Sequence, residues 1–270
     1  MKKVALVTGS TRGIGYNIIK KLAENNYNVV ITGKTINDKK RGDIYTTQKS
    51  IEKYNIDSLA VSLDIRSLSS IQDCVEIVDK KFGRLDVLIN NASALWRSDI
   101  LSTTDKRYDL INNINTKGTF NISRECLPLM LRNNFGHIIN HSPPLIHINN
   151  PQIYKNMTAY MISKFGMSMV ALGISSEFKN KGIVANTIWP KRAIESDAVI
   201  KNNIGERKNW RRPDIISDAI IYMLKEDSYK FTGNQLIDED YLKSKGIKNF
   251  SKYNCIPDSK PVDLYSLLSR

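Results

Sequence analysis

Short runs of apolar residues alternate along this chain with longer segments in which apolar residues recur every three or four positions. The short runs have the length of strands that are buried on both faces, and the longer segments have the spacing of amphipathic helices. Strands are expected over residues 3–7, 28–32, 59–63, 85–89, 136–142, 182–189 and 231–238, and helices over 14–25, 45–54, 71–82, 104–134, 158–180 and 213–225. This alternation predicts one α/β domain, a doubly wound parallel sheet over residues 1–250, followed by a polar tail over 251–270.

A glycine-rich turn joins the first predicted strand to the first predicted helix, with the spacing TGxxxGxG. Backbone N–H groups that converge at a helix N-terminus bind phosphate well, especially where no Cβ atoms stand in the way. The alternative is a structural connection between a strand and a helix. We predict a dinucleotide site formed by Gly9, Ser10, Thr11, Arg12, Gly13, Ile14 and Gly15.

The residues after the second and third predicted strands bear on the choice of dinucleotide. An acid after the second strand selects NAD, whereas a base accommodates the 2′-phosphate of NADP. Lys34 stands there and Arg12 adds a second cation, so we predict NADP over NAD. The alternative is that both side chains are simply part of a basic surface. Asp64 and Ile65 follow the third strand, beside the expected adenine site. Asp64 could accept from the adenine amine or cap the next helix, although Ser67 is the better cap.

A tyrosine and a lysine four residues apart, Tyr160 and Lys164, fall within the predicted helix over 158–180. This spacing puts both side chains on one helix face. A phenol, with an ordinary pKa of about 10, is a weak base, but a neighbouring ammonium favours the phenolate. Ser142 ends the fifth strand, at the sheet edge where ligands bind. Such pairs are also common on helix surfaces, and only the accompanying residues indicate a site.

Together these motifs resemble the short-chain dehydrogenase/reductase family. The chain has the family's TGxxxGxG turn, and its NNAG segment is present as Asn90-Asn91-Ala92-Ser93. Its helix asparagine, its serine and its YxxxK follow in order and at near-family spacing, at Asn115, at Ser142 and at Tyr160 with Lys164. The joint occurrence of these motifs predicts a site, which no single motif does.

The resemblance implies a seven-stranded Rossmann fold of strand order 3-2-1-4-5-6-7, and hydride transfer between NADP(H) and a carbonyl or secondary alcohol. Tyr160 would be the general acid/base, and Lys164 would lower its pKa and hold the nicotinamide ribose. Ser142 would hydrogen-bond the substrate oxygen, and Asn115 would kink its helix and complete a proton relay. The family pairs its long helices between subunits, which implies a homodimer or homotetramer. The cofactor would also be lined by Asn91, Ala92 and Pro190.

Three features depart from the family pattern. Ser93 and Lys191 each stand where the family has glycine, and Pro143-Pro144 open a long loop before Tyr160. These departures leave open the alternative that the protein binds the cofactor without catalysing a reaction and acts as a sensor or scaffold. The substrate lid is expected over 192–212. Apolar residues around it would suit either a lipid-like ligand or ordinary packing: Trp189, Ile194 and Trp210.

The charge balance raises the question of nucleic-acid or anionic-membrane binding. Forty basic residues against 27 acidic ones give a net charge of +13. The basic residues are dispersed except at 39–41 and 207–212, and neither cluster has the interleaved aromatics of a stacking platform. We therefore predict a solvated basic surface, with no nucleic acid as a partner. No apolar run approaches the ~20 residues of a membrane span.

Cysteine and histidine usage predicts no metal site. The three cysteines are widely separated, and His141 and His147 have no clustered partner, so both are interpreted as structural or solvent-facing. An odd number of thiols fits a reducing compartment, and no signal-peptide pattern precedes the first strand. We expect a cytoplasmic protein, with an organelle matrix left open.

Overall fold

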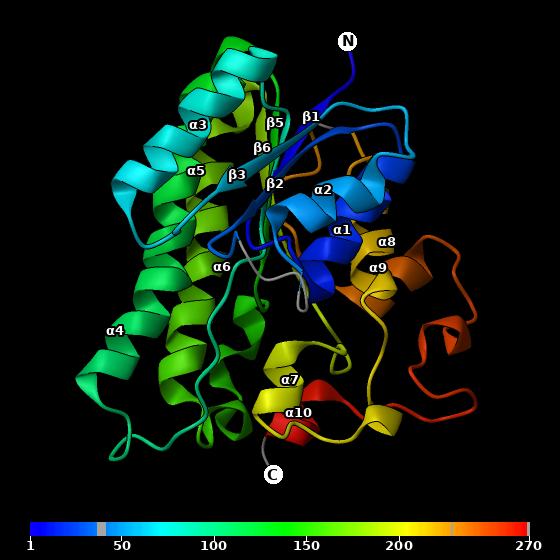
Figure 1. Cartoon of the computed structure of the whole chain (residues 1–270). Helices are drawn as coiled ribbons and strands as arrows, with labels where there is room; N and C mark the ends of the chain where they lie inside the picture. Colours follow the sequence, from blue (N-terminus) through cyan, green and yellow to red (C-terminus); the bar gives the residue numbers. More distant parts are fainter. Residues whose placement is uncertain (37–41, 228, 269–270) are drawn as a thin grey trace.

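A computed structural model of the chain describes residues 1–36, 42–227 and 229–268, so the basic cluster at 39–41 lies outside the described residues. One parallel sheet has the order β3-β2-β1-β4-β5-β6-β7, which confirms the predicted doubly wound Rossmann topology (Figure 1). Its strands are β1 (Val4–Val7), β2 (Asn28–Gly33), β3 (Ser58–Ser62), β4 (Val87–Asn90), β5 (Gly136–His141), β6 (Ile183–Trp189) and β7 (Gln235–Ile237).

Helices cover both faces of the sheet (Figure 1). On one face lie α1 (Gly13–Glu24), α2 (Ile44–Ile51), α8 (Asp214–Met223) and α9 (Asp238–Ser244). On the other lie α3 (Leu68–Phe82), α4 (Asp105–Ile114), α5 (Thr116–Arg132) and α6 (Thr158–Phe178). Two short helices lie beyond the carboxyl ends of the strands, α7 (Asp197–Lys201) and α10 (Leu264–Leu268).

The central strand β1 illustrates why these runs form buried strands. All of its four residues are buried. Ala5 and Val7 pack in the cluster under α1 and α8, whereas Val4 and Leu6 pack in the cluster under α3, α5 and α6. Because successive side chains of a strand face opposite sides, a strand between two helical layers needs apolar residues at every position.

The predicted helix over 104–134 is two helices, because the backbone turns at Asn115 between α4 and α5. The predicted fourth strand begins two residues late, at Val87. Before it, the buried carboxylate of Asp86 accepts hydrogen bonds from Arg84 and from the Val4 amide, at 2.9 and 2.8 Å between Oδ2 and the donor nitrogens. Side-chain hydrogen bonds of this kind shift element ends without disturbing the apolar pattern.

The segment expected as a polar tail packs on the domain along much of its described length. Leu264 and Leu267 are buried in a cluster with Trp210 and Ile204. The Leu264 amide donates to the carbonyl of Lys191 at 2.9 Å, which fixes α10 beside the end of β6. Leu264, Leu267 and Leu268 have helical spacing, but the pattern spans only five residues among polar ones.

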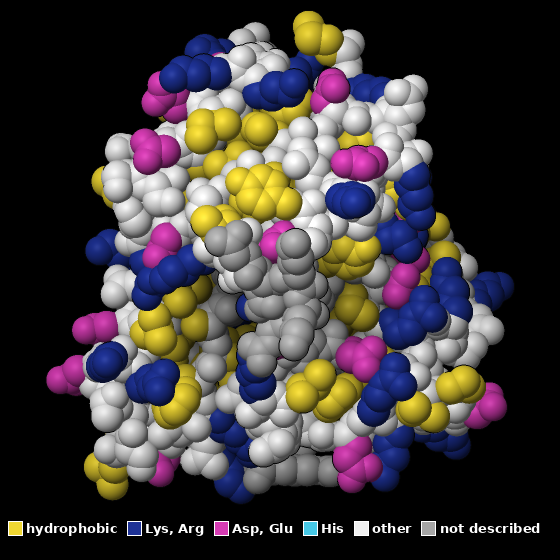
Figure 2. All heavy atoms as spheres, in the orientation of Figure 1, with side chains coloured by type: hydrophobic (Ala, Val, Ile, Leu, Met, Phe, Trp, Pro, Cys, Tyr) yellow, Lys and Arg dark blue, Asp and Glu magenta, His cyan; other side chains and the backbone are white. Residues whose placement is uncertain are grey.

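Charges of both signs are interspersed over the surface. Figure 2 shows Lys and Arg side chains among Asp and Glu side chains on one face of the molecule. Several of them form ion pairs, such as Arg132 Nη2 with Asp79 Oδ1 at 2.6 Å. Among the described residues, no helix has both the length and the apolar character to cross a membrane.

The packing of α10 predicts a stability cost for shortening one of its buried leucines. Leu267 is 2% exposed, so Leu267→Ala should lower the free energy of unfolding by about 2–4 kcal/mol through lost burial and a cavity. Ile256→Ala is the matched control in the same segment, because that side chain is 38% exposed. Urea denaturation of both variants measures the difference; equal free energies of unfolding would contradict this packing.

Candidate active site

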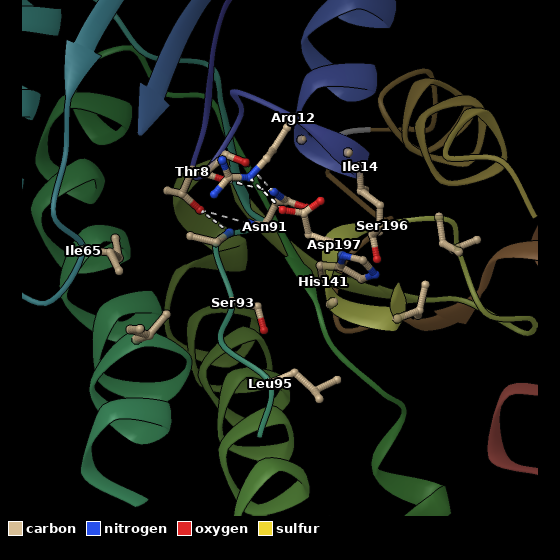
Figure 3. A pocket seen from close by; sticks show the side chains of 18 of the residues that line it. Thr8, Arg12, Ile14, Ile65, Asn91, Ser93, Leu95, His141, Ser196 and Asp197 are labelled. Carbon is tan, nitrogen blue, oxygen red and sulfur yellow. Dashed lines mark hydrogen bonds and ion pairs between the residues drawn. The ribbon is translucent and has the colours of Figure 1, made fainter. Parts of the chain in front are cut away.

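A cavity of about 550 Å³ opens at the carboxyl ends of the strands (Figure 3). Most of the residues predicted from the sequence line it: Gly9, Thr11, Arg12, Gly13, Ile14, Gly15, Lys34, Asp64, Ile65, Asn91, Ala92, Tyr160, Lys164 and Pro190. Three other predicted residues, all within the described part of the chain, are fully buried and do not line the cavity: Ser10, Asn115 and Ser142.

The backbone of the turn favours glycine at three of its positions. Gly9 and Gly13 have φ of +64° and +55°, a region that favours glycine. A Cβ on Gly15 would lie 2.3 Å from the Gly9 carbonyl oxygen. Ser10 faces away from the cavity, and its Oγ accepts from the Thr32 amide at 2.9 Å. The side chain of Arg12, at the N-cap of α1, makes no capping hydrogen bond within the described chain, which leaves the first amides of α1 available to an anion.

Cations and acids alternate where β2 and β3 end. Lys34 Nζ lies 3.3 Å from Asp64 Oδ2, and Arg66 Nη2 lies 2.6 Å from the same oxygen. These two contacts hold the pKa of Asp64 well below its usual range, and the contact with Arg66 has the larger effect. Arg12 Nε lies 3.6 Å from Asp197 Oδ2 at the start of α7, and Figure 3 shows the two side chains facing each other. Asp64 therefore already holds two cations, and Ser67 caps α3 as expected.

Tyr160 and Lys164 line the same cavity from α6, and both are buried, at 6% and 1% exposure. Lys164 Nζ donates to Met167 Sδ at 3.3 Å and lies 5.5 Å from the centre of the Trp189 ring. Burial lowers the pKa of Lys164 to about 7. Burial raises the pKa of Tyr160, and a hydrogen-bonding interaction with the Ser93 side chain opposes that rise. Each of these pKa shifts disfavours the charged form because water is excluded.

Asn115 and Ser142 are engaged with the protein itself. Asn115 Oδ1 accepts from the Ala94 amide at 2.8 Å, and its Nδ2 donates to the Ala94 carbonyl at 2.9 Å and to Ser163 Oγ at 2.9 Å. The helix break that the resemblance implied is therefore present at Asn115. The side chain of Asn115 anchors the segment after β4. Ser142 Oγ pairs with Ser168 Oγ at 2.9 Å, on the α6 side of the sheet.

Several cavity residues were missed by the sequence reasoning. Ser93 was noted only as a departure from a glycine, and Arg66 was not considered, although each stands within two residues of a predicted one. His141 lines the cavity, and its Nε2 has no hydrogen-bond partner in the described part of the chain. Burial, and then the charge of Lys164, lower the pKa of His141 to about 3, so the ring is neutral. Leu264 and Leu268 of α10 close one side, although this segment was expected to be a polar tail.

Comparison with known proteins identifies similar chains. A family model described as short chain dehydrogenase matches residues 3–205. Hydroxysteroid dehydrogenase-like protein 2 from Homo sapiens is 42% identical and that from Mus musculus is 41% identical, over 93% of this chain. The chain spans 60% and 51% of the lengths of these relatives. The crystal structure of a short chain dehydrogenase from Mycobacterium thermoresistibile has a TM-score of 0.88 at 35% identity, covering 97% of this chain and 94% of that one.

The buried Lys164 predicts a pH-dependent stability of the protein without ligand. Because burial lowers its pKa to about 7 from 10.5, the folded protein loses a proton that the unfolded chain keeps. Above pH 10.5 Lys164 is neutral in both states and costs no stability. As the pH falls towards 7, the free energy of unfolding decreases, because only the unfolded chain takes up the proton readily. Lys164→Met should then raise the unfolding temperature most at pH 6–7, and least above pH 10. Thermal unfolding across this range measures it; a difference independent of pH would contradict it.

Proposed function

We propose that this chain, which belongs to the short chain dehydrogenase family, is an NADP(H)-dependent oxidoreductase acting on a carbonyl or secondary alcohol. The members of this family are oxidoreductases that use NAD(P), and this chain is one of them. The observation that carries the finer proposal is the meeting of Tyr160 and Lys164 with the glycine turn in one cavity.

The residues present fit a dinucleotide. The cradle that a Cβ on Gly15 would fill and the uncapped first amides of α1 suit the pyrophosphate. Lys34 and Arg66 share the single carboxylate of Asp64, so this cluster keeps a net positive charge, which suits the 2′-phosphate of NADP. Arg12 would add a further cation on release from Asp197.

When bound, the nicotinamide supplies the hydride in reduction and accepts it in oxidation. Tyr160 gives a proton from its phenol oxygen to the substrate oxygen in reduction, and takes that proton back in oxidation. Lys164, with its pKa lowered by burial, holds the ribose and passes protons on. The apolar cavity wall, which includes Leu95, Ile204 and Leu264, suits a substrate with a lipid-like body.

A cofactor-binding protein without catalysis is the second candidate. It is favoured by two contacts: Lys164 donates to Met167, and Ser142 pairs with Ser168 instead of facing the cavity. Turnover of any carbonyl by the wild-type protein separates the two proposals.

We also propose that the chain forms a homodimer or homotetramer through the layer of α4, α5 and α6. Large apolar side chains that are 41–56% exposed lie on these three helices: Tyr108, Phe120, Ile162 and Met169. Large exposed apolar side chains on one helical layer support an interface there if they form a contiguous patch.

Removing the phenol hydroxyl tests the assignment of Tyr160. Tyr160→Phe should lower NADPH-dependent reduction of a panel of ketones and aldehydes by about 100-fold or more, because no group replaces the proton donor. NADPH affinity, followed by nicotinamide fluorescence, should stay near that of the wild type. Unchanged turnover in this variant would remove Tyr160 from the mechanism, and an inactive wild type that binds NADPH would support the second candidate.

Cofactor choice can be measured by parallel titrations with NADPH and NADH. The wild type should prefer NADPH, and Lys34→Ala should weaken NADPH binding about tenfold while leaving NADH binding nearly unchanged, because only NADPH carries the 2′-phosphate. Lys49→Ala removes the same charge from the exposed surface of α2 and should change neither affinity. A wild-type preference for NADH would overturn the choice of NADP.

The proposed interface predicts that a charge on α5 dissociates the oligomer. Phe120→Glu should give a monomer in sedimentation velocity, because the carboxylate would be buried between subunits. Ile77→Glu on α3, at a side chain that is 41% exposed, is the control and should keep the wild-type mass. A monomeric wild type would refute the interface.

A further inference from the structure

Two histidines on β5 are buried in different ways. His137 and His141 are four residues apart, so their side chains lie on the same face of the sheet. His137 Nε2 pairs with Asn186 Nδ2 at 2.9 Å. Within the described part of the chain, His141 Nε2 has no hydrogen-bond partner, although the side chain is only 9% exposed. A buried polar atom without a partner lowers stability, so packing alone does not account for His141.

The ring of His141 forms part of the cavity wall (Figure 3). It lies edge to face with the Trp189 ring, with 5.8 Å between the ring centres and 62° between the ring planes. Lys164 Nζ lies 5.5 Å from the centre of the same Trp189 ring. The Nε2 atom is closed off from water. Rotation about the Cβ–Cγ bond of histidine is soft, so a turn of the ring can present a nitrogen to a ligand in the cavity.

The sheet order places His141 at one end of a bound dinucleotide. In a doubly wound sheet the ligand crosses the point where the strand order reverses, which here lies between β1 and β4. Lys34 and Asp64, on the adenine side, follow β2 and β3. The nicotinamide end would therefore extend over β4, β5 and β6. His141 and Trp189 are the last residues of β5 and β6, and both line the cavity.

A neutral imidazole suits the nicotinamide end of the cofactor. Burial, and then the charge of Lys164, hold the pKa of His141 at about 3, so the ring carries no charge near neutral pH. A neutral ring has one N–H donor and one nitrogen acceptor, so it can bond a hydroxyl or an amide. It also does not repel the positive charge of an oxidised nicotinamide.

We propose that His141 binds the nicotinamide riboside end of the cofactor, through a hydrogen bond between its ring and a hydroxyl or amide group there. This inference rests on the proposed function and assigns to it a residue outside the glycine turn and the Tyr160–Lys164 pair. The ligand supplies the partner that the ring lacks in the free protein. Proteins accept such a loss of stability where a side chain serves binding. The alternative is that His141 only fills space beside Trp189.

Ligands of increasing length test this role without turnover. His141→Phe keeps a flat ring beside Trp189 and removes both nitrogens. In calorimetric titrations it should weaken NADPH binding about tenfold, because one hydrogen bond is lost. The affinity for 2′,5′-ADP, which lacks the nicotinamide riboside, should not change. A loss for 2′-phospho-ADP-ribose as well would assign the bond to the ribose, and an unchanged affinity would assign it to the amide.

Two further variants provide the controls. His141→Gln keeps a hydrogen-bonding amide near the position of the ring nitrogen and should recover part of the NADPH affinity. His137→Phe makes the same change on the same strand, at a histidine whose partner is Asn186 in the core. It should leave all three affinities unchanged. Equal weakening of NADPH and 2′,5′-ADP in His141→Phe would overturn the proposal, and so would a raised KM for the carbonyl at unchanged NADPH affinity.

Thermal unfolding without ligand separates binding from packing. His141→Phe should unfold at the wild-type temperature or above it, because a buried nitrogen without a partner is removed. His137→Phe should unfold at a lower temperature, because it loses the bond to Asn186. A lower unfolding temperature of His141→Phe with unchanged NADPH affinity would show a packing role and refute the proposal. If the wild type binds NADPH but reduces no carbonyl, the catalytic proposal fails and the result for His141 stands; if it binds no NADPH, both fail.

Discussion

The connection between the end of β1 and the end of β4 is the constraint on which the rest of the site depends. Asn91 Nδ2 donates to the carbonyls of Thr8 and Gly9 at 3.0 and 3.1 Å, and Thr8 Oγ1 accepts from the amides that follow β4. The two strands are neighbours in the sheet, so a few polar bonds suffice to fix two loops against each other. The glycine turn and the segment that carries Ser93 are therefore held together as one unit. Gly15 completes it, because any side chain there would separate the turn from Asn91.

The second feature of this site is that it buries two basic side chains. Lys164 and His141 lie in the same buried region beside Trp189, and exclusion of water lowers the pKa of both. A buried amine or imidazole without a charged partner lowers stability, and proteins keep such groups mainly where they act. Among the described residues, the Nε2 of His141 lacks a hydrogen-bond partner, which marks this wall as polar as well as enclosed. The cost to stability and the low-dielectric setting proposed for proton transfer both come from this burial.

The outer wall of the cavity comes from segments far apart in the chain. Residues after β6 run beside the C-terminal segment, which is joined to them by backbone bonds such as Leu264 to Lys191 and Cys255 to Trp210. His147 Nδ1 and Tyr265 Oη are 2.6 Å apart, so the loop after β5 is tied to α10 as well. The C-terminal segment thereby adds the apolar side chains of Leu264 and Leu268 to the cavity lining.

The sequence by itself determined the glycine turn and the positions of Tyr160 and Lys164, because these depend on local spacing: glycine placement and one helical turn. The apolar period indicated the strands, and the resemblance to the family supplied their order. It also placed the helix break at Asn115, through the family motif. Only the tertiary structure decided where hydroxyls and charges point. Ser142 and Ser93 are both serines at strand ends, yet one pairs with α6 and the other faces the cavity. The packing of α10 was decided in the same way, because it joins residues that are far apart in the chain. The contact of Arg66 with Asp64 depends on side-chain orientation, which residue spacing does not set.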